Sequence, residues 1–191
     1  MPFVPWDTIP QANDDNKRRA DVLILTEDGR ERRAVYNGGW MYLHDAADTI
    51  ESPQSIPALT DTLLTIDGLA SDSTTEFRRG IPLDTWSENT LRPSATGEAY
   101  AINFTMNIAK ETSASTFVDV KVKIGSTYTT LVSQDRRPLV KDSGTHDFLF
   151  FSGNVFITDA FTLNGGRFFM NAQHDVTVWN KAIYLQRTHS P

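Results

Sequence analysis

The residues best suited to catalysis or metal binding in this 191-residue chain are its four histidines. His44, His146 and His174 are each followed by an aspartate. Neighbours on a strand point to opposite faces, so this adjacency does not make a catalytic dyad. Together with His189, the histidines never fall at a metal-ligand spacing such as His-x-His or His-x-x-x-His. We therefore interpret them as structural or surface residues.

Other signatures of chemistry are missing from the sequence. It contains no cysteine, which excludes disulfides, cysteine-ligated metals and thiol catalysis. It has no Gly-x-Ser-x-Gly elbow, phosphate loop or dinucleotide fingerprint. Paired carboxylates for glycoside hydrolysis stay an alternative because 24 acidic residues offer many pairings, although a sandwich without long loops has little surface for a cleft. We predict a protein that is not an enzyme, with no catalytic residue, cofactor or metal.

Charge is divided unevenly along the chain, whose formal net charge is -6. Residues 1–95 carry 16 acidic and 9 basic residues, a net of -7, whereas residues 96–191 carry 8 and 9, a net of +1. A nucleic-acid partner requires a basic surface. No apolar run approaches the roughly 20 residues that a membrane-spanning helix needs. We expect neither nucleic acid nor a membrane as a partner, and a nearly neutral C-terminal half suits packing against copies of itself.

The first twenty residues are predicted to form an extended arm. Three prolines among the first ten residues fix φ, which excludes a helix or a central strand. The arm also contains large apolar residues, namely Phe3, Val4, Trp6 and Ile9. We interpret these as anchors that dock on another surface, and a disordered terminus with incidental aromatics is the alternative.

Residues 21–58 are predicted to form a small β-meander. Three short strand-like segments between residues 22 and 43 are separated by the turn signals Asp28-Gly29 and Asn37-Gly38. Three short strands bury little by themselves, so this sheet must pack against another surface.

Residues 59–191 are predicted to form an antiparallel β-sandwich or a barrel. The first strand is expected within residues 61–66, and period-two alternation dominates from residue 96 onward, as in residues 100–108 and 118–124. Seven or eight strands separated by turn signals leave little room for helix.

Two segments of the sandwich, residues 148–151 and 168–170, are apolar at consecutive positions. Strands of this kind need cover on both faces, and the second cover can come from another chain or from the N-terminal region. The alternative is a central strand with one semi-exposed phenylalanine.

A Pro-rich arm is followed by the segments Asn37 to Ala46 and Leu63 to Gly68 and then by the alternating sandwich. This order of segments resembles that of small virion proteins of tailed bacteriophages. The C-terminal half is similar to trimeric jelly-roll modules of the tumour-necrosis-factor and C1q kind, which such phages use as capsid decoration proteins, head fibres and tail-fibre tips. The resemblance implies an all-β jelly roll and a homotrimer made in the host cytoplasm and placed on the outer surface of the virion. It also implies a trimer interface built from Phe148, Phe150, Phe151, Phe168 and Phe169.

Two roles compete within this class. A decoration or cement protein binds the major capsid protein or another virion protein through its arm and stabilises the shell. A head- or tail-fibre tip is instead a receptor-binding module that recognises a host-surface glycan or receptor. The sequence has no coiled-coil heptads or collagen-like repeat for a shaft, and its arm carries anchors. We therefore expect the cement role, with the fibre tip as the alternative.

Overall fold

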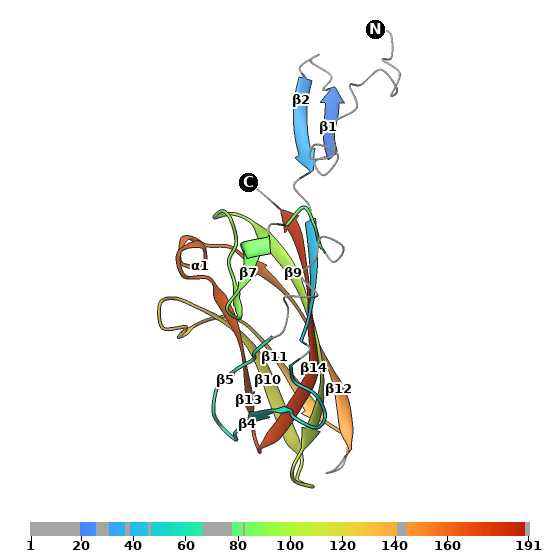
Figure 1. Cartoon of the computed structure of the whole chain (residues 1–191). Coiled ribbons are helices and arrows are strands. Elements are labelled where there is room, and N and C mark those ends of the chain that lie inside the picture. Colours follow the sequence, from blue (N-terminus) through green and yellow to red (C-terminus); the bar gives the residue numbers. More distant parts are fainter. Residues whose placement is uncertain are drawn as a thin grey trace. The chain divides into compact units, whose positions relative to one another are not determined.

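The computed structural model describes residues 20–25, 31–36, 39–45, 47–66, 78–81, 83–140 and 145–189. The chain divides into two units, residues 1–37 and 38–191. In the first unit, β1 (Ala20–Leu25) pairs antiparallel with β2 (Glu31–Tyr36), as Figure 1 shows. This hairpin was predicted from its turn signal. The proposed arm anchors Phe3, Val4, Trp6 and Ile9 lie outside the described residues.

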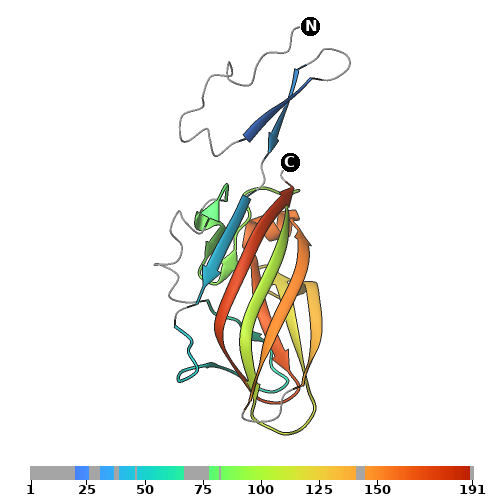
Figure 2. The ribbon, with the colours of Figure 1, turned by 90° about the vertical axis from the view of Figure 1, so that its right-hand side faces the viewer.

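The second unit consists of two antiparallel sheets packed face to face (Figures 1 and 2). The first sheet contains, in order, β12 (His146–Phe156), β9 (Ala99–Lys110), β14 (Val176–His189), β3 (Gly39–His44) and β6 (Arg78–Arg79), with β4 (Gln54–Ile56) also paired to β14. The second contains β11 (Thr130–Leu139), β10 (Thr116–Ile124), β13 (Gly166–Ala172), β8 (Thr90–Leu91) and β7 (Trp86–Ser87), with β5 (Thr62–Leu63) also paired to β13. From β9 to β14 the chain changes sheet at every step except the β10–β11 hairpin, which makes the sandwich a jelly roll.

The meander predicted over residues 21–58 is wrong in its third strand. β3 does not continue the β1–β2 hairpin but pairs with β14, placing Tyr42 opposite Tyr184. The reason is burial, since Met41 and Leu43 lie on the inner face of β3 and are buried in the sandwich core. A third strand on an isolated hairpin would have left both side chains exposed. The sandwich accordingly includes β3 and β4 and begins before residue 59.

The core lies between the sheets and follows the predicted alternation. On β9 the side chains of Tyr100, Ile102, Phe104, Met106 and Ile108 are buried, and the intervening residues face outward. Aromatic rings join the two sheets, because the Phe104 ring on β9 meets the Phe168 ring on β13 edge to face at a centroid distance of 5.6 Å. Such contacts add to the stabilisation that comes from apolar burial.

β14 contains a bulge that reverses its alternation. Its pairing with β9 shifts register between Trp179 and Ala182. Val176 and Val178 face the core before the bulge, and Lys181, Ile183 and Leu185 face it afterwards. On the other edge of β14, the bulge separates residues paired with β4 from residues paired with β3. An extra residue at this point lets both halves of the strand keep their apolar side chains inside.

Helix contributes little to the structure. The short 3₁₀-helix η3 (Leu83–Thr85) precedes β7, and α1 (Asp159–Asn164) connects β12 to β13. In the part of the chain that the structure describes, no helix is long and apolar enough to span a membrane. On α1, the ring of Phe161 is fully buried and lies close to the backbone of Gly166 at the start of β13.

The Phe161 ring leaves no room for a side chain at position 166. A Cβ atom added to Gly166 would lie 2.4 Å from Phe161 Cζ. We expect Gly166→Ala to lower the free energy of unfolding by about 1–3 kcal/mol, because overpacking a rigid core forces its neighbours to move. Chemical denaturation measures this change. In a protein that already carries Phe161→Leu, the same Gly166→Ala substitution should lower the free energy of unfolding by less. An equal loss in the presence and in the absence of the Phe161 ring would contradict the explanation.

Candidate oligomer interface

The outward face that β12, β9, β14 and β3 form in the first sheet carries no charged side chain. The edge strand β6, where Arg79 pairs with Trp40, is not part of this face. The alternation and register of β12, β9, β14 and β3 identify the residues on this face. They are Trp40, Tyr42 and His44; Ala99, Ala101, Asn103, Thr105, Asn107 and Ala109; His146, Phe148, Phe150, Ser152, Asn154 and Phe156; and Thr177, Trp179, Ala182, Tyr184 and Gln186. We call this surface the uncharged face. It contains no Asp, Glu, Lys or Arg, although charged residues make up 22% of the chain.

Aromatic side chains on the uncharged face form two groups. On β12, Phe148, Phe150 and Phe156 are 66%, 46% and 62% exposed. On the opposite side of β9, the Trp40 and Tyr184 rings stack at a centroid distance of 6.2 Å. Short alanine, asparagine and threonine side chains of β9 separate the groups. A large exposed apolar surface of this kind is typical of an interaction site.

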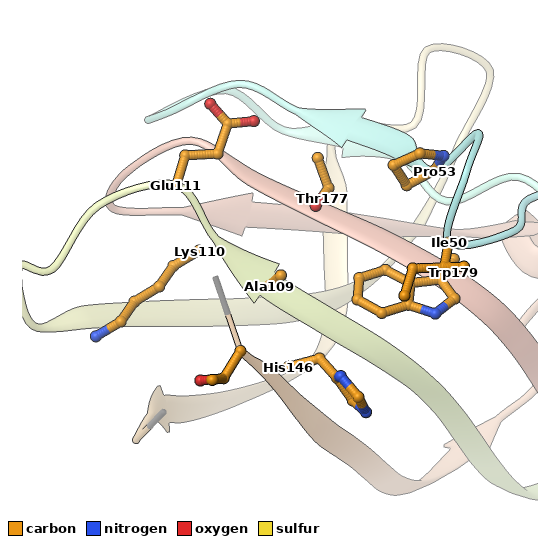
Figure 3. Close-up of a pocket in the computed structure, with 9 residues that line it drawn as sticks. Ile50, Pro53, Ala109, Lys110, Glu111, His146, Thr177 and Trp179 are labelled. Carbon is orange, nitrogen blue, oxygen red and sulfur yellow. The ribbon is translucent and has the colours of Figure 1, made fainter. Parts of the chain in front are cut away.

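A pocket of about 380 Å³ lies at one end of the uncharged face (Figure 3). The His146 and Trp179 rings meet there edge to face, 5.6 Å apart, and Ile50 and Pro53 from the loop before β4 complete the wall. Lys110 also lines the pocket, but its Nζ donates to the carbonyl of Ala114, 3.2 Å away. Glu111, Thr145 and Thr177 line the pocket as well, so it combines aromatic and apolar groups with polar ones.

The outward face of the second sheet is charged, and its charges are paired. Asp61 accepts hydrogen bonds from Lys121 at 2.7 Å, from Asn171 at 2.9 Å and from Lys123. Burial alone would raise the pKa of Asp61, but these partners outweigh it and lower the pKa to about 2. Beside them, Arg136 donates two hydrogen bonds to Asp119, at 2.8 and 2.9 Å. Polar groups of this kind favour contact with water.

A buried carboxylate next to the core serves structure rather than chemistry. Glu98 accepts hydrogen bonds from the Ser94 hydroxyl at 2.6 Å, from Tyr100 at 3.1 Å and from Arg187 at 3.1 Å. Burial opposes ionisation, but the hydrogen bonds from Ser94, Tyr100 and Ala95 hold the pKa of Glu98 below its usual value. The described residues contain no group of three or more His, Cys, Asp or Glu side chains placed to hold a metal ion.

The five phenylalanines predicted to form one interface lie in three places. Phe148 and Phe150 lie together on the uncharged face. Phe151 and Phe168 are buried in the core of the same chain, so assigning them to an interface was wrong. Phe169 lies on the second sheet, with its ring 6.5 Å from the Tyr128 ring and 5.1 Å from Lys123 Nζ. These two neighbours form a mixed aromatic and charged surface, so Phe169 lies apart from Phe148 and Phe150.

Several residues of the uncharged face were missed from the sequence, among them Trp40, Tyr184 and Phe156. The signal that could have found them is the absence of charge at every second position of residues 99–109, together with aromatic residues in the segments that pair beside it. Recognising it requires the strand order, because these segments are far apart in the sequence.

Comparisons with known proteins found no matching family model and no matching curated protein. Several solved structures are similar. The PRD1 vertex protein P5 aligns with a TM-score of 0.45 and 15% identity over 88% of this chain and 82% of its own. The Eiger TNF from S. frugiperda aligns with a TM-score of 0.44 and 8% identity over 80% of this chain and 94% of its own. A chain of the T13 IBDV viral particle aligns with a TM-score of 0.39 and 9% identity over 87% of this chain and 35% of its own.

The ion pairs of Asp61 make stability depend on pH. Because the folded pKa of about 2 lies below the ordinary value of 3.8, Asp61 contributes stability above about pH 4 and loses it as the pH falls through 2. We expect Asp61→Asn to lower the free energy of unfolding by about 1–2 kcal/mol near pH 6 and by almost nothing near pH 2. Denaturation curves across this range test the prediction.

The matched control is Glu88→Gln. Glu88 pairs with Arg92 at 3.3 Å, but both side chains are largely exposed. An exposed pair contributes little, so this variant should stay close to the wild type throughout the pH range. If Asp61→Asn lowered the free energy of unfolding by the same amount at every pH, the role assigned to the Asp61 charge would be wrong.

Proposed function

We propose that this protein is a structural virion component that forms a homotrimer through the uncharged face and decorates the outer surface of a phage capsid as a cement protein. The observation that carries the proposal is the uncharged face itself, where Phe148, Phe150 and Phe156 are exposed among outward residues of β12, β9, β14 and β3 that include no charged side chain. The virion role and the three-fold symmetry follow the resemblance of the sequence to trimeric phage jelly-roll proteins.

Copies of the same chain are the occupants that best suit this face. Burying a charge without a partner is costly, and a sheet face without charges can pack against itself without this cost. Its aromatic residues, which lie on both sides of the short side chains of β9, and its lack of charge match the composition of the buried part of an oligomer interface. The charged outward face of the second sheet then stays in water.

The N-terminal part is proposed to bind the capsid. Residues 1–37 form a unit of their own, and its described strands, β1 and β2, pair with each other and not with a strand of the two sandwich sheets. A docking segment can therefore be attached there without altering the fold of the trimer-forming domain. Phe3, Val4, Trp6 and Ile9 supply apolar side chains for such docking.

A single charge on the uncharged face should break the trimer. Phe148 is 66% exposed, so Phe148→Asp is tolerated by the folded chain but would bring unpaired carboxylates into the interface. We expect the dissociation constant for self-association to rise by about 100-fold or more. Analytical ultracentrifugation measures the oligomeric state, and circular dichroism checks the fold.

Phe117→Asp is the matched control for this substitution. Phe117 is 44% exposed but lies on the outward face of β10 in the second sheet. The control should remain a trimer. A wild-type protein that is monomeric at micromolar concentration, or equal effects of the two substitutions, would overturn the assignment of the interface.

Deleting residues 1–10 tests the capsid-binding role. The truncated protein should remain a folded trimer but should no longer co-sediment with capsids that lack this protein, because the apolar anchors are gone. Full occupancy on capsids would contradict the arm hypothesis. The fibre-tip alternative gives a different result, since residues 38–191 alone should then compete with the phage for attachment to host cells.

A further inference from the structure

A lysine and two aspartates are buried together behind the bulge of β14. Lys181 Nζ lies 3.1 Å from Asp45 Oδ2, donates a hydrogen bond to the Asp48 carboxylate, and donates another to Gln54 Oε1 at 2.8 Å. The side chains of Lys181 and Asp45 are fully buried, and that of Asp48 is 19% exposed. None of these residues belongs to the uncharged face.

The backbone holds the three side chains in place. The Asp45 amide donates to the Lys181 carbonyl at 2.8 Å, and the Asn180 amide donates to the Asp48 carbonyl at 3.1 Å. Asp45 Oδ1 also accepts the amide of Ala47 at 2.9 Å. The amine and the carboxyl groups are thus positioned by fixed elements, which is the condition under which a slow reaction between neighbouring groups becomes fast.

The charges of this cluster do not balance when all three groups are ionised. One ammonium group then faces two carboxylates in a site where the Lys181 and Asp45 side chains are fully buried and only the Asp48 side chain is partly exposed. A buried site favours neutral forms, and burial raises the pKa of Asp45 above its usual value. Moving a proton from an ammonium to a carboxylate produces a neutral amine beside a neutral carboxylic acid without changing the number of protons. Buried lysines act as nucleophiles in this form.

We propose that Lys181 and Asp48 condense to an isopeptide bond, with Asp45 as the group that transfers the proton. Asp45, in its neutral form, donates its proton to the Asp48 carboxylate, and the neutral Nζ of Lys181 attacks Cγ of that carboxyl group, forming the C–N bond. The Asp45 carboxylate takes a proton from the attacking nitrogen and delivers it to the departing hydroxyl. The C–O bond breaks and one water molecule leaves, so no oxidant or other reactant is needed.

The product joins two distant parts of the sandwich covalently. Residues 48 and 181 are 133 positions apart in the sequence, so the bond would close a ring that contains most of the second unit. It would fasten the loop between β3 and β4 to the centre of the first sheet.

Another lysine–aspartate contact in the same molecule provides an internal comparison. Lys123 also donates to Asp61, but these side chains are 17% and 28% exposed. Lys121 and Asn171 also donate to the same carboxylate, and the low pKa of Asp61 keeps it ionised. A carboxylate in this state is a poor acceptor for an amine, so we expect no bond at Lys123.

The test is the intact mass of the purified full-length protein, measured after denaturation. The wild type should be lighter than its sequence mass by one water molecule, and digestion should yield a branched peptide that joins Lys181 to Asp48. Lys181→Met and Asp48→Ala should each have their full sequence mass. Lys123→Met, the matched control, should keep the deficit of one water molecule. Asp48→Asn should lose ammonia instead of water if it reacts, because the amide then supplies the leaving group.

The role of Asp45 is tested separately by Asp45→Asn, which should leave the full sequence mass or acquire the deficit at least 100-fold more slowly. A reaction as fast as in the wild type would overturn that role. A folded wild type with its full sequence mass, or a branch at other residues, would overturn the bond itself. Because this measurement is made on the wild type, it decides the question even where a variant fails to fold.

Discussion

The bulge in β14 is the constraint on which both faces of the first sheet depend. β14 lies between β9 on one edge and β3 and β4 on the other, and it changes partner from β4 to β3 at the bulge. If the strand kept a strict period of two from Val176 onward, Ile183 and Leu185 would face away from the core. The inserted residue returns them to the interior and leaves Ala182 and Tyr184 on the outside.

The same bulge explains why a lysine occupies the interior. Once the alternation is reversed, the Lys181 side chain points into the core and requires partners. The loop between β3 and β4 supplies them through Asp45, Asp48 and Gln54. Because the same loop also contributes Ile50 and Pro53 to the pocket beside the uncharged face, the buried cluster fixes part of the outer surface.

The features that could be predicted from the sequence are those encoded by local periodicity. The alternation of residues 100–108 specifies a strand and its inner face whatever the strand pairs with. The run Phe148-Leu149-Phe150-Phe151 does not specify an inner face, because apolar side chains would face inward whichever alternate set of residues pointed to the core. Only packing against β9 and the second sheet selects Leu149 and Phe151. Asn37-Gly38 is likewise ambiguous, since a turn signal is equally compatible with a hairpin and with an exit toward a new sheet. Lys181 reads as a surface lysine because a bulge has no local signature.

The segregation of charge has a cause that links fold to assembly. Each sheet buries one face in the core, and only the other is available for a partner or for water. The second sheet places Asp61, Lys121, Asp119 and Arg136 on its outer face, where ion pairing and hydration are both available. In the first sheet, the outward residues of β12, β9, β14 and β3 include no charged residue. The sandwich alone requires no such difference, because either sheet could carry charged residues on its outer face without loss of core packing. A difference that the fold does not require points to selection on that surface, and association through it is the explanation that also accounts for the exposed phenylalanines of β12.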